Sequence, residues 1–191
     1  MKTQSQTILK LKKIFKLGYI PSRGNESYTE KENGKSVSYY VYPNCLAHAC
    51  FNLTNQQIKS LDYTDREIFS SFIKTPYYSD KYILRDILRF IKQCGLKTTK
   101  CEVSSPLQHN EWKIAIYFGW RNNTKDYHFL LLEKDETWSS KWGFSITVDH
   151  FKIPPTKIEH NGYSYHLYGF YKITNPYANN KTPDDNQTEL I

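Results

Sequence analysis

The 191-residue chain carries 26 basic and 19 acidic residues, a formal net charge of +7, and 39% of its residues are hydrophobic. A chain of this length and apolar content can bury one substantial core, which argues against wholesale disorder and favours a single domain. No apolar run approaches the ~18 residues of a membrane-spanning helix. The charge leaves an acidic protein or a nucleic acid open as partner, although interspersed Asp and Glu are typical of a solvated surface.

Four cysteines are too few for the disulfide framework of a small secreted domain, and the sequence shows no secretory signal. We therefore expect reduced thiols and a cytoplasmic location. Residues 1–18 alternate apolar and basic side chains at helical spacing and end at Gly18. This pattern predicts a basic N-terminal helix that packs on the chain's own core, and docking on an anionic membrane surface is the alternative.

The stretch YPNCLAHACFNL at residues 42–53 holds the first candidate for chemistry. Pro43 delivers the chain in an extended conformation to Asn44, a residue type that favours the N-cap of a helix. Cys45 then opens an apolar run, which places its thiol in the first turn of a helix over residues 45–60. Because a helix N-terminus lowers the pKa of a thiol, Cys45 is a candidate nucleophile.

The remaining chain divides into helices followed by strands. Apolar spacing predicts helices over residues 65–74 and 79–94, the second ending at Gly95. After Gly95 the apolar period changes from 3.6 to 2, which predicts strands joined by short turns and hence an antiparallel sheet. The predicted strands cover residues 98–103, 112–120, 127–133, 144–151 and 163–174.

This order of elements indicates an α+β fold. We expect one domain over residues 19–174, and the polar residues 175–191 predict a flexible tail. Within the strand series, His128 stands at the head of an apolar run, where it could act as the general base that a nucleophilic thiol needs. His150 and His166 are spare candidates for the base.

The two segments resemble a known superfamily of enzymes. A cysteine at a helix start, followed by a strand-borne histidine, is similar to the papain-like cysteine hydrolases, and Asn44-Cys45-Leu46 with His48-Ala49 resembles the cysteine motif of ovarian-tumour-type deubiquitinases. The segments DYHF at residues 126–129 and TWSSK at residues 137–141 also resemble motifs of uncharacterised bacterial proteins.

The resemblance implies a papain-like fold, with N-terminal helices packed on a C-terminal antiparallel sheet. It also implies that Cys45 attacks a carbonyl carbon after His128 takes its proton, and that the Cys45 backbone N–H and the Asn44 side chain bind the oxyanion. Papain-like enzymes use Asn or Asp to orient the histidine, which points to Asp149 on the following strand. A tight hairpin at residues 134–137 would instead bring residues 140–145 opposite His128.

Two alternatives to the hydrolase remain open. Cys45, His48 and Cys50 could be imagined as metal ligands with Cys94 and Cys101, but one helix cannot easily turn its three side chains to a single ion, so we expect no metal and no cofactor. The main hypothesis is a hydrolase of peptide, isopeptide or amide bonds with a protein or peptide substrate. The second alternative to this hydrolase is a non-catalytic binding protein whose basic, aromatic surface holds an acidic protein or a nucleic acid.

Overall fold

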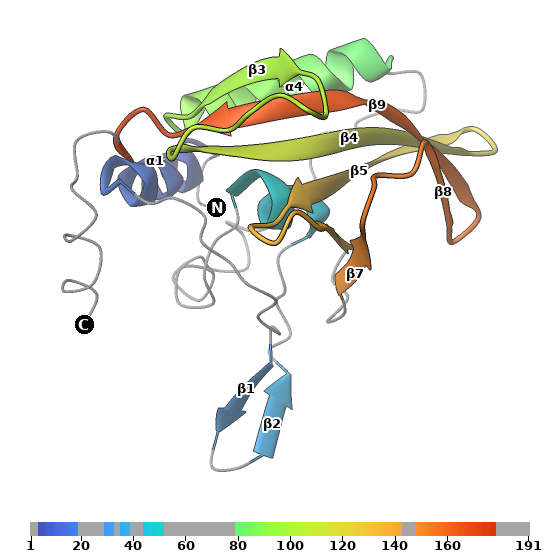
Figure 1. The fold of residues 1–191 in the computed structure, drawn as a ribbon, viewed down its shortest axis with the longest axis horizontal. Helices are drawn as coiled ribbons and strands as arrows, with labels where there is room; N and C mark the ends of the chain where they lie inside the picture. The colour runs from blue at the N-terminus through green and yellow to red at the C-terminus, as the bar shows by residue number, and fades with distance from the viewer. Residues whose placement is uncertain are drawn as a thin grey trace.

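The computed structural model describes residues 4–18, 29–32, 35–38, 44–51, 79–142 and 148–178 (Figure 1). Its helices are α1 (Gln4–Lys16), the short π-helix η1 (Ala47–Phe51) and α4 (Asp80–Gln93). Its strands are β1 (Thr29–Glu32), β2 (Lys35–Ser38), β3 (Lys97–Cys101), β4 (Glu111–Arg121), β5 (Thr124–Leu132), β6 (Trp138–Lys141), β7 (Val148–Phe151), β8 (Lys157–His160) and β9 (Tyr163–Thr174). Within these ranges, no helix is both long enough and apolar enough to cross a membrane.

Seven strands form one antiparallel sheet in the order β3, β9, β4, β5, β6, β7, with β8 pairing to β9. The long strand β9 pairs with β3 through residues 170–174 and with β8 through residues 163–166. Strands β1 and β2 make a separate hairpin that projects away from this sheet in Figure 1. Two of the sheet strands, β6 and β8, fall in segments where the sequence pattern predicted no strand.

The papain-like arrangement expected for the fold is wrong. The described part of the chain is mostly an open antiparallel sheet with few helices, and not a set of N-terminal helices packed on a C-terminal sheet. The helix at Cys45 is described only as far as Phe51, and the helix expected over residues 65–74 lies outside the described residues. Period-2 patterns located the longest strands, but they do not show how a sheet is covered.

The described helices α1, η1 and α4 cover one face of the sheet, called here the first face. Along β4 and β5 alternate side chains project to opposite faces. First-face residues of these strands pack with buried residues of all three helices in one core, which includes Ile114, Ile116, Phe118, Tyr127, Phe129 and Leu131 with Leu11, Phe15, Phe51, Ile87 and Phe90. In Figure 1, α4 lies along the part of the sheet that β3 and β9 form, and η1 lies beside β5. The apolar spacing on α1 and α4 is explained by this burial.

The opposite, second face is covered by the sheet's own connection. A smaller core lies here, built around Ala115, Tyr117, Leu130, Trp138 and Tyr165. The chain leaves β7 at one edge of the sheet and must reach β8, which pairs with β9 on the other side of β4. On the way, Pro155 accepts a hydrogen bond from Tyr117 Oη at 2.8 Å, and Thr156 accepts one from Leu167 N–H at 3.0 Å. Among the described residues, this crossing covers the second face where a helical layer could otherwise lie.

The ends of the described chain also contact the core. Leu11 and Phe15 of α1 are fully buried, so the N-terminal helix packs on the core. Asn175 is fully buried and donates to Phe15 O at 3.0 Å. Asn175, the first residue of the segment predicted as a tail, therefore connects β9 to α1. Residues 179–191 lie outside the described residues.

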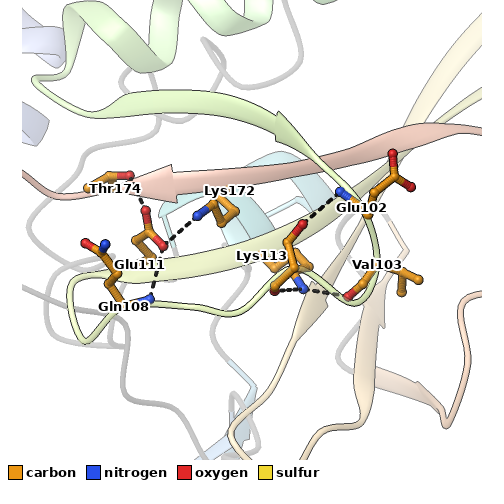
Figure 2. Close-up of polar contacts among 8 residues, drawn as sticks. Glu102, Val103, Gln108, Glu111, Lys113, Lys172 and Thr174 are labelled. Atoms are coloured by element: carbon orange, nitrogen blue, oxygen red, sulfur yellow. Dashed lines mark hydrogen bonds and ion pairs between the residues drawn. The ribbon is translucent and has the colours of Figure 1, made fainter.

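A polar cluster ties the β3–β4 connection to the sheet (Figure 2). The ammonium of Lys113, a residue with 3% exposure, donates to Val103 O at 2.6 Å and to Ser105 O at 2.7 Å. Beside it, the Glu111 carboxylate binds Lys172 Nζ at 3.0 Å. Burial lowers the pKa of Lys113, but a buried charge with two carbonyl partners can be tolerated.

Replacing Lys113 by Met is expected to lower the free energy of unfolding by about 2 kcal/mol, since hydrogen bonds from a charged donor contribute more than neutral ones. Urea denaturation followed by circular dichroism measures the change. Lys100→Met, at an exposed position of β3, is the matched control and should change stability by less than about 0.5 kcal/mol. Equal losses in the two variants would contradict the stabilising role of the Lys113 contacts.

Candidate functional site

The start of η1 lies against strand β5. Asn44 Oδ1 accepts a hydrogen bond from Ala47 N–H at 3.0 Å, so Asn44 caps the helix as its residue type predicts. In the first turn, the Cys45 thiol donates to Tyr127 O, with 3.8 Å between Sγ and oxygen. The two segments are thus adjacent in space although they lie 82 residues apart in the sequence. The helix then continues as a π-helix, a form often found at functional sites.

Burial decides the protonation state of the Cys45 thiol. Cys45 is 6% exposed, and burial, reinforced by the negative charge of Asp126, raises the pKa of the thiol to about 12. Hydrogen bonds from the backbone N–H groups of Phe129 and Leu46, and the charge of Lys141, lower this pKa by less. The expectation of a thiolate at Cys45 is therefore wrong for this geometry, because desolvation outweighs the donors at the helix start.

The imidazole of His128 lies on the second face of the sheet. Its neighbours Tyr127 and Phe129 belong to the first-face core, which also contains Cys45. His128, one residue out of phase with them, projects the opposite way and is 1% exposed. Its Nε2 lies 2.7 Å from Ser140 Oγ on β6.

The indole of Trp142 separates two histidine rings on the second face. It stacks on His128 with ring centroids 3.7 Å apart and on His160 with centroids 3.8 Å apart. Its N–H donates to Asp149 Oδ2 at 2.9 Å. Burial, and then the charge of nearby His160, lower the pKa of His128 to about 3. His128 is consequently neutral at pH 7.

The structure therefore brings the strand of His128 to Cys45 without joining the two side chains. Among the described residues, the thiol contacts the backbone of β5, and the imidazole contacts Ser140, Trp142 and Tyr165. A thiol with a pKa of about 12 beside a neutral imidazole is not a thiolate–imidazolium pair. As it stands, this arrangement holds a protonated, unactivated thiol.

Ser140, and not Asp149, contacts His128. The tight hairpin after β5 pairs Leu130 with Ser140, so the register is the alternative one that the sequence left open. Asp149 is exposed on β7, where its backbone pairs with Ser140 and its carboxylate holds the Trp142 indole. The structure thus places Asp149, the residue expected to orient the imidazole, against Trp142, which in turn stacks on His128.

Buried polar side chains connect η1 to β6 on the first face. His48 is 3% exposed, and its Nε2 lies 2.9 Å from Ser139 Oγ. The Ser139 hydroxyl donates to the Glu133 carboxylate, so its oxygen accepts the proton that His48 Nε2 carries. Fully buried Lys141 follows Ser139 on the same face of β6. These groups surround the start of η1 with polar atoms inside an otherwise apolar core.

The residues considered as metal ligands do not gather. Cys50 belongs to the first-face core, Cys94 ends α4, and Cys101 lies at the end of β3. Within the described ranges, no group of three or more His, Cys, Asp or Glu side chains is arranged to hold a metal ion.

The family model "Domain of unknown function (DUF7689)" matches residues 44–172. The chain belongs to this family. The match begins at the cap residue Asn44 and ends within β9, so the family domain takes in η1 and the large sheet without α1. No curated protein and no solved structure matches the chain.

Several residues around His128 were not found from the sequence. Ser140 lies in the window that a tight hairpin brings opposite His128, but the sequence does not single it out, because it carries neither a carboxylate nor an amide. His160 and Tyr165 reach the site from β8 and β9, and Tyr165 Oη donates to Asp126 Oδ2 at 2.6 Å. Alternation along β5 places Asp126 and His128 on one face, which was the only sequence signal for this grouping.

Proposed function

We propose that the chain is a cysteine hydrolase of peptide, isopeptide or amide bonds, with Cys45 as nucleophile and His128 as general base. The observation that carries the proposal is the contact between the capped helix start and β5 at the residues on either side of His128. Cys45 Sγ lies 3.8 Å from Tyr127 O, and a hydrogen bond from Phe129 N–H lowers the pKa of the thiol. A helix-borne thiol thus lies against the backbone on either side of His128, whose imidazole is the candidate base.

Catalysis requires a rearrangement of β5 that turns the imidazole toward the thiol, because Cβ of His128 projects from the second face and rotation about χ1 alone leaves the ring there. The ladder between β5 and β6 ends at the Leu130–Ser140 pair, so no backbone pairing of β6 occupies the edge of β5 at His128. Turning breaks the bond to Ser140, worth about 1 kcal/mol, and the stack on Trp142, worth roughly 0.5–1.5 kcal/mol. The turned ring is then a minor conformer, which a substrate can select.

In the turned conformer the chemistry balances with these two groups and water. The thiol proton passes to His128 as the sulfur attacks the carbonyl carbon, forming an S–C bond and an oxyanion. The imidazolium then protonates the leaving nitrogen as the C–N bond breaks, and water hydrolyses the thioester with His128 as base. The Cys45 backbone N–H and the Asn44 amide group would bind the oxyanion, each donor contributing roughly 3 kcal/mol to the transition state.

An electrophilic vinyl ester probe, which requires an activated thiol, tests the proposal. After incubation at pH 7, mass spectrometry of the digested protein should show the adduct at Cys45 and little at the buried thiols of Cys50 and Cys94. The half-buried thiol of Cys101 supplies the reference rate of an ordinary cysteine. Modification of Cys45 at or below the Cys101 rate, in folded protein, would overturn the hydrolase proposal.

Ser140→Ala is expected to accelerate the modification of Cys45. The substitution removes the hydrogen bond that holds the imidazole away from the thiol, which raises the population of the turned ring by about fivefold for 1 kcal/mol. The rate of adduct formation measures this change, with Ser105→Ala, remote from the site in the β3–β4 connection, as the control. A slower reaction in Ser140→Ala would mean that Ser140 orients the catalytic imidazole and would contradict its role in the resting conformer.

A further inference from the structure

The strongest unassigned feature is an exposed aromatic strip at the end of the first face. It consists of Trp120 on β4 with His166 and Tyr168 on β9. Trp120 is 37% exposed, Tyr168 is 40% exposed, and His166 is also exposed. The rings of Trp120 and His166 have centroids 5.9 Å apart. Large aromatic surfaces are more often buried, so their grouping on one face needs an explanation.

A bulge in β9 creates the strip. The pairing of β4 with β9 shifts register between Ile116 and Tyr117, which leaves Tyr168 without a partner in the ladder. The extra residue reverses the alternation of β9, so that His166 pairs with Phe118 of the first face. Tyr168 then packs edge-on against Phe118, with centroids 5.2 Å apart. Without the bulge, the side chain of His166 would project from the other face.

The α4 helix does not extend over the strip. Its first residue, Asp80, binds Lys125 Nζ at 3.1 Å, and Figure 1 shows the β4–β5 hairpin continuing past this end of the helix. Lys125 Nζ also lies 6.0 Å from the centroid of the Trp120 ring. Exposed Lys100 on β3 lies next to Gly169 of β9, and exposed Lys157 on β8 pairs with His166 in the ladder. Asp80 binds Lys125 and Glu159 binds Lys157, so Lys100 supplies the excess of positive charge among these groups.

We propose that the strip binds single-stranded nucleic acid, with bases stacked on Trp120 and Tyr168. Aromatic side chains on an exposed sheet, flanked by cations, bind unpaired bases without reading sequence, since every base offers a π-face. The phosphates complement the local cations and the net charge of +7. An acidic polypeptide would satisfy the charges but would leave the aromatic rings without stacking partners. The strip is independent of the Cys45 site.

Fluorescence anisotropy of a labelled oligothymidylate of about 12 nucleotides tests this inference. We expect saturable binding that weakens as salt rises, and a roughly 5- to 150-fold loss of affinity in Trp120→Ala, which corresponds to 1–3 kcal/mol for one stacked base. Trp120→Phe should retain most of the affinity. Ile153→Ala, at a 78% exposed residue between β7 and β8, is the control and should bind as the unchanged protein does.

The same oligonucleotide should quench the intrinsic fluorescence of the protein, and Trp120→Phe should remove most of the quenching. Cys45→Ala should bind the oligonucleotide normally, which separates this inference from the hydrolase proposal. No saturable binding at low salt, equal affinities of Trp120→Ala and Ile153→Ala, or equally effective displacement by polyglutamate of the same charge would each overturn it.

Discussion

Replacing His128 by Ala is expected to slow the modification of Cys45 by the vinyl ester probe by roughly 10²–10⁴-fold, the contribution of a positioned general base. Burial raises the pKa of the Cys45 thiol to about 12, so almost none of it ionises at pH 7 without a base. Loss of the imidazole therefore removes the only route to an activated sulfur that the proposal offers. The second-order rate of adduct formation, measured by mass spectrometry, is the readout.

Two comparisons separate this effect from unfolding. His128→Gln keeps a hydrogen-bonding group near Ser140 but provides no base, so it should slow the reaction as much as His128→Ala does. The thiol of Cys101, on β3 and remote from His128, should react at an unchanged rate in both variants. A reduction of less than about tenfold at Cys45, or an equal change at Cys101, would contradict a catalytic His128.

The second large effect concerns stability at acid pH. Burial, with the charge of His160, lowers the pKa of His128 from 6.5 to about 3. Between these values the unfolded chain binds a proton at His128 and the folded chain does not, so the free energy of unfolding must fall as the pH falls. This single group should remove about 3 kcal/mol of stability between pH 7 and pH 4.

Urea denaturation at several pH values measures the loss, with His128→Gln as the comparison. The variant should be less stable at pH 7, because it lacks the ring that stacks on Trp142. Its stability should nevertheless decline less steeply than that of the unchanged protein between pH 6.5 and pH 4, since it has no titrating group at this position. Parallel declines in the two proteins would show that the buried imidazole does not cause the acid sensitivity.

Local features of the fold could be predicted because they depend on neighbours in the sequence. Apolar residues repeating every three to four positions located α4, and Gly95, with φ of +91°, ends it. Asn44 caps the helix start because its side chain reaches a backbone N–H three residues ahead. Period-2 patterns located β3, β4, β5 and β9, although β6 and β8, with only four residues each, gave too short a pattern.

The candidate site shows where such prediction stops. The sequence correctly selected two segments that meet, since Cys45 contacts the backbone of β5 beside His128. The sequence could not determine that Tyr127 and Phe129 face the helices. His128 lies between them on β5, so its imidazole projects from the second face. The distance from helix start to strand depends on packing of the whole first face, and the partners of His128 depend on the register of the β5–β6 hairpin.

The sequence by itself determined the helix start at Asn44, the strands that carry His128 and its neighbours, and the excess of positive charge. Only the tertiary structure decided which face each side chain occupies, that burial keeps the Cys45 thiol protonated, and that a bulge in β9 gathers an exposed aromatic strip. The physical reason is the range of the interactions. Capping and periodicity act within a few residues, whereas desolvation and strand register depend on segments far apart in the sequence.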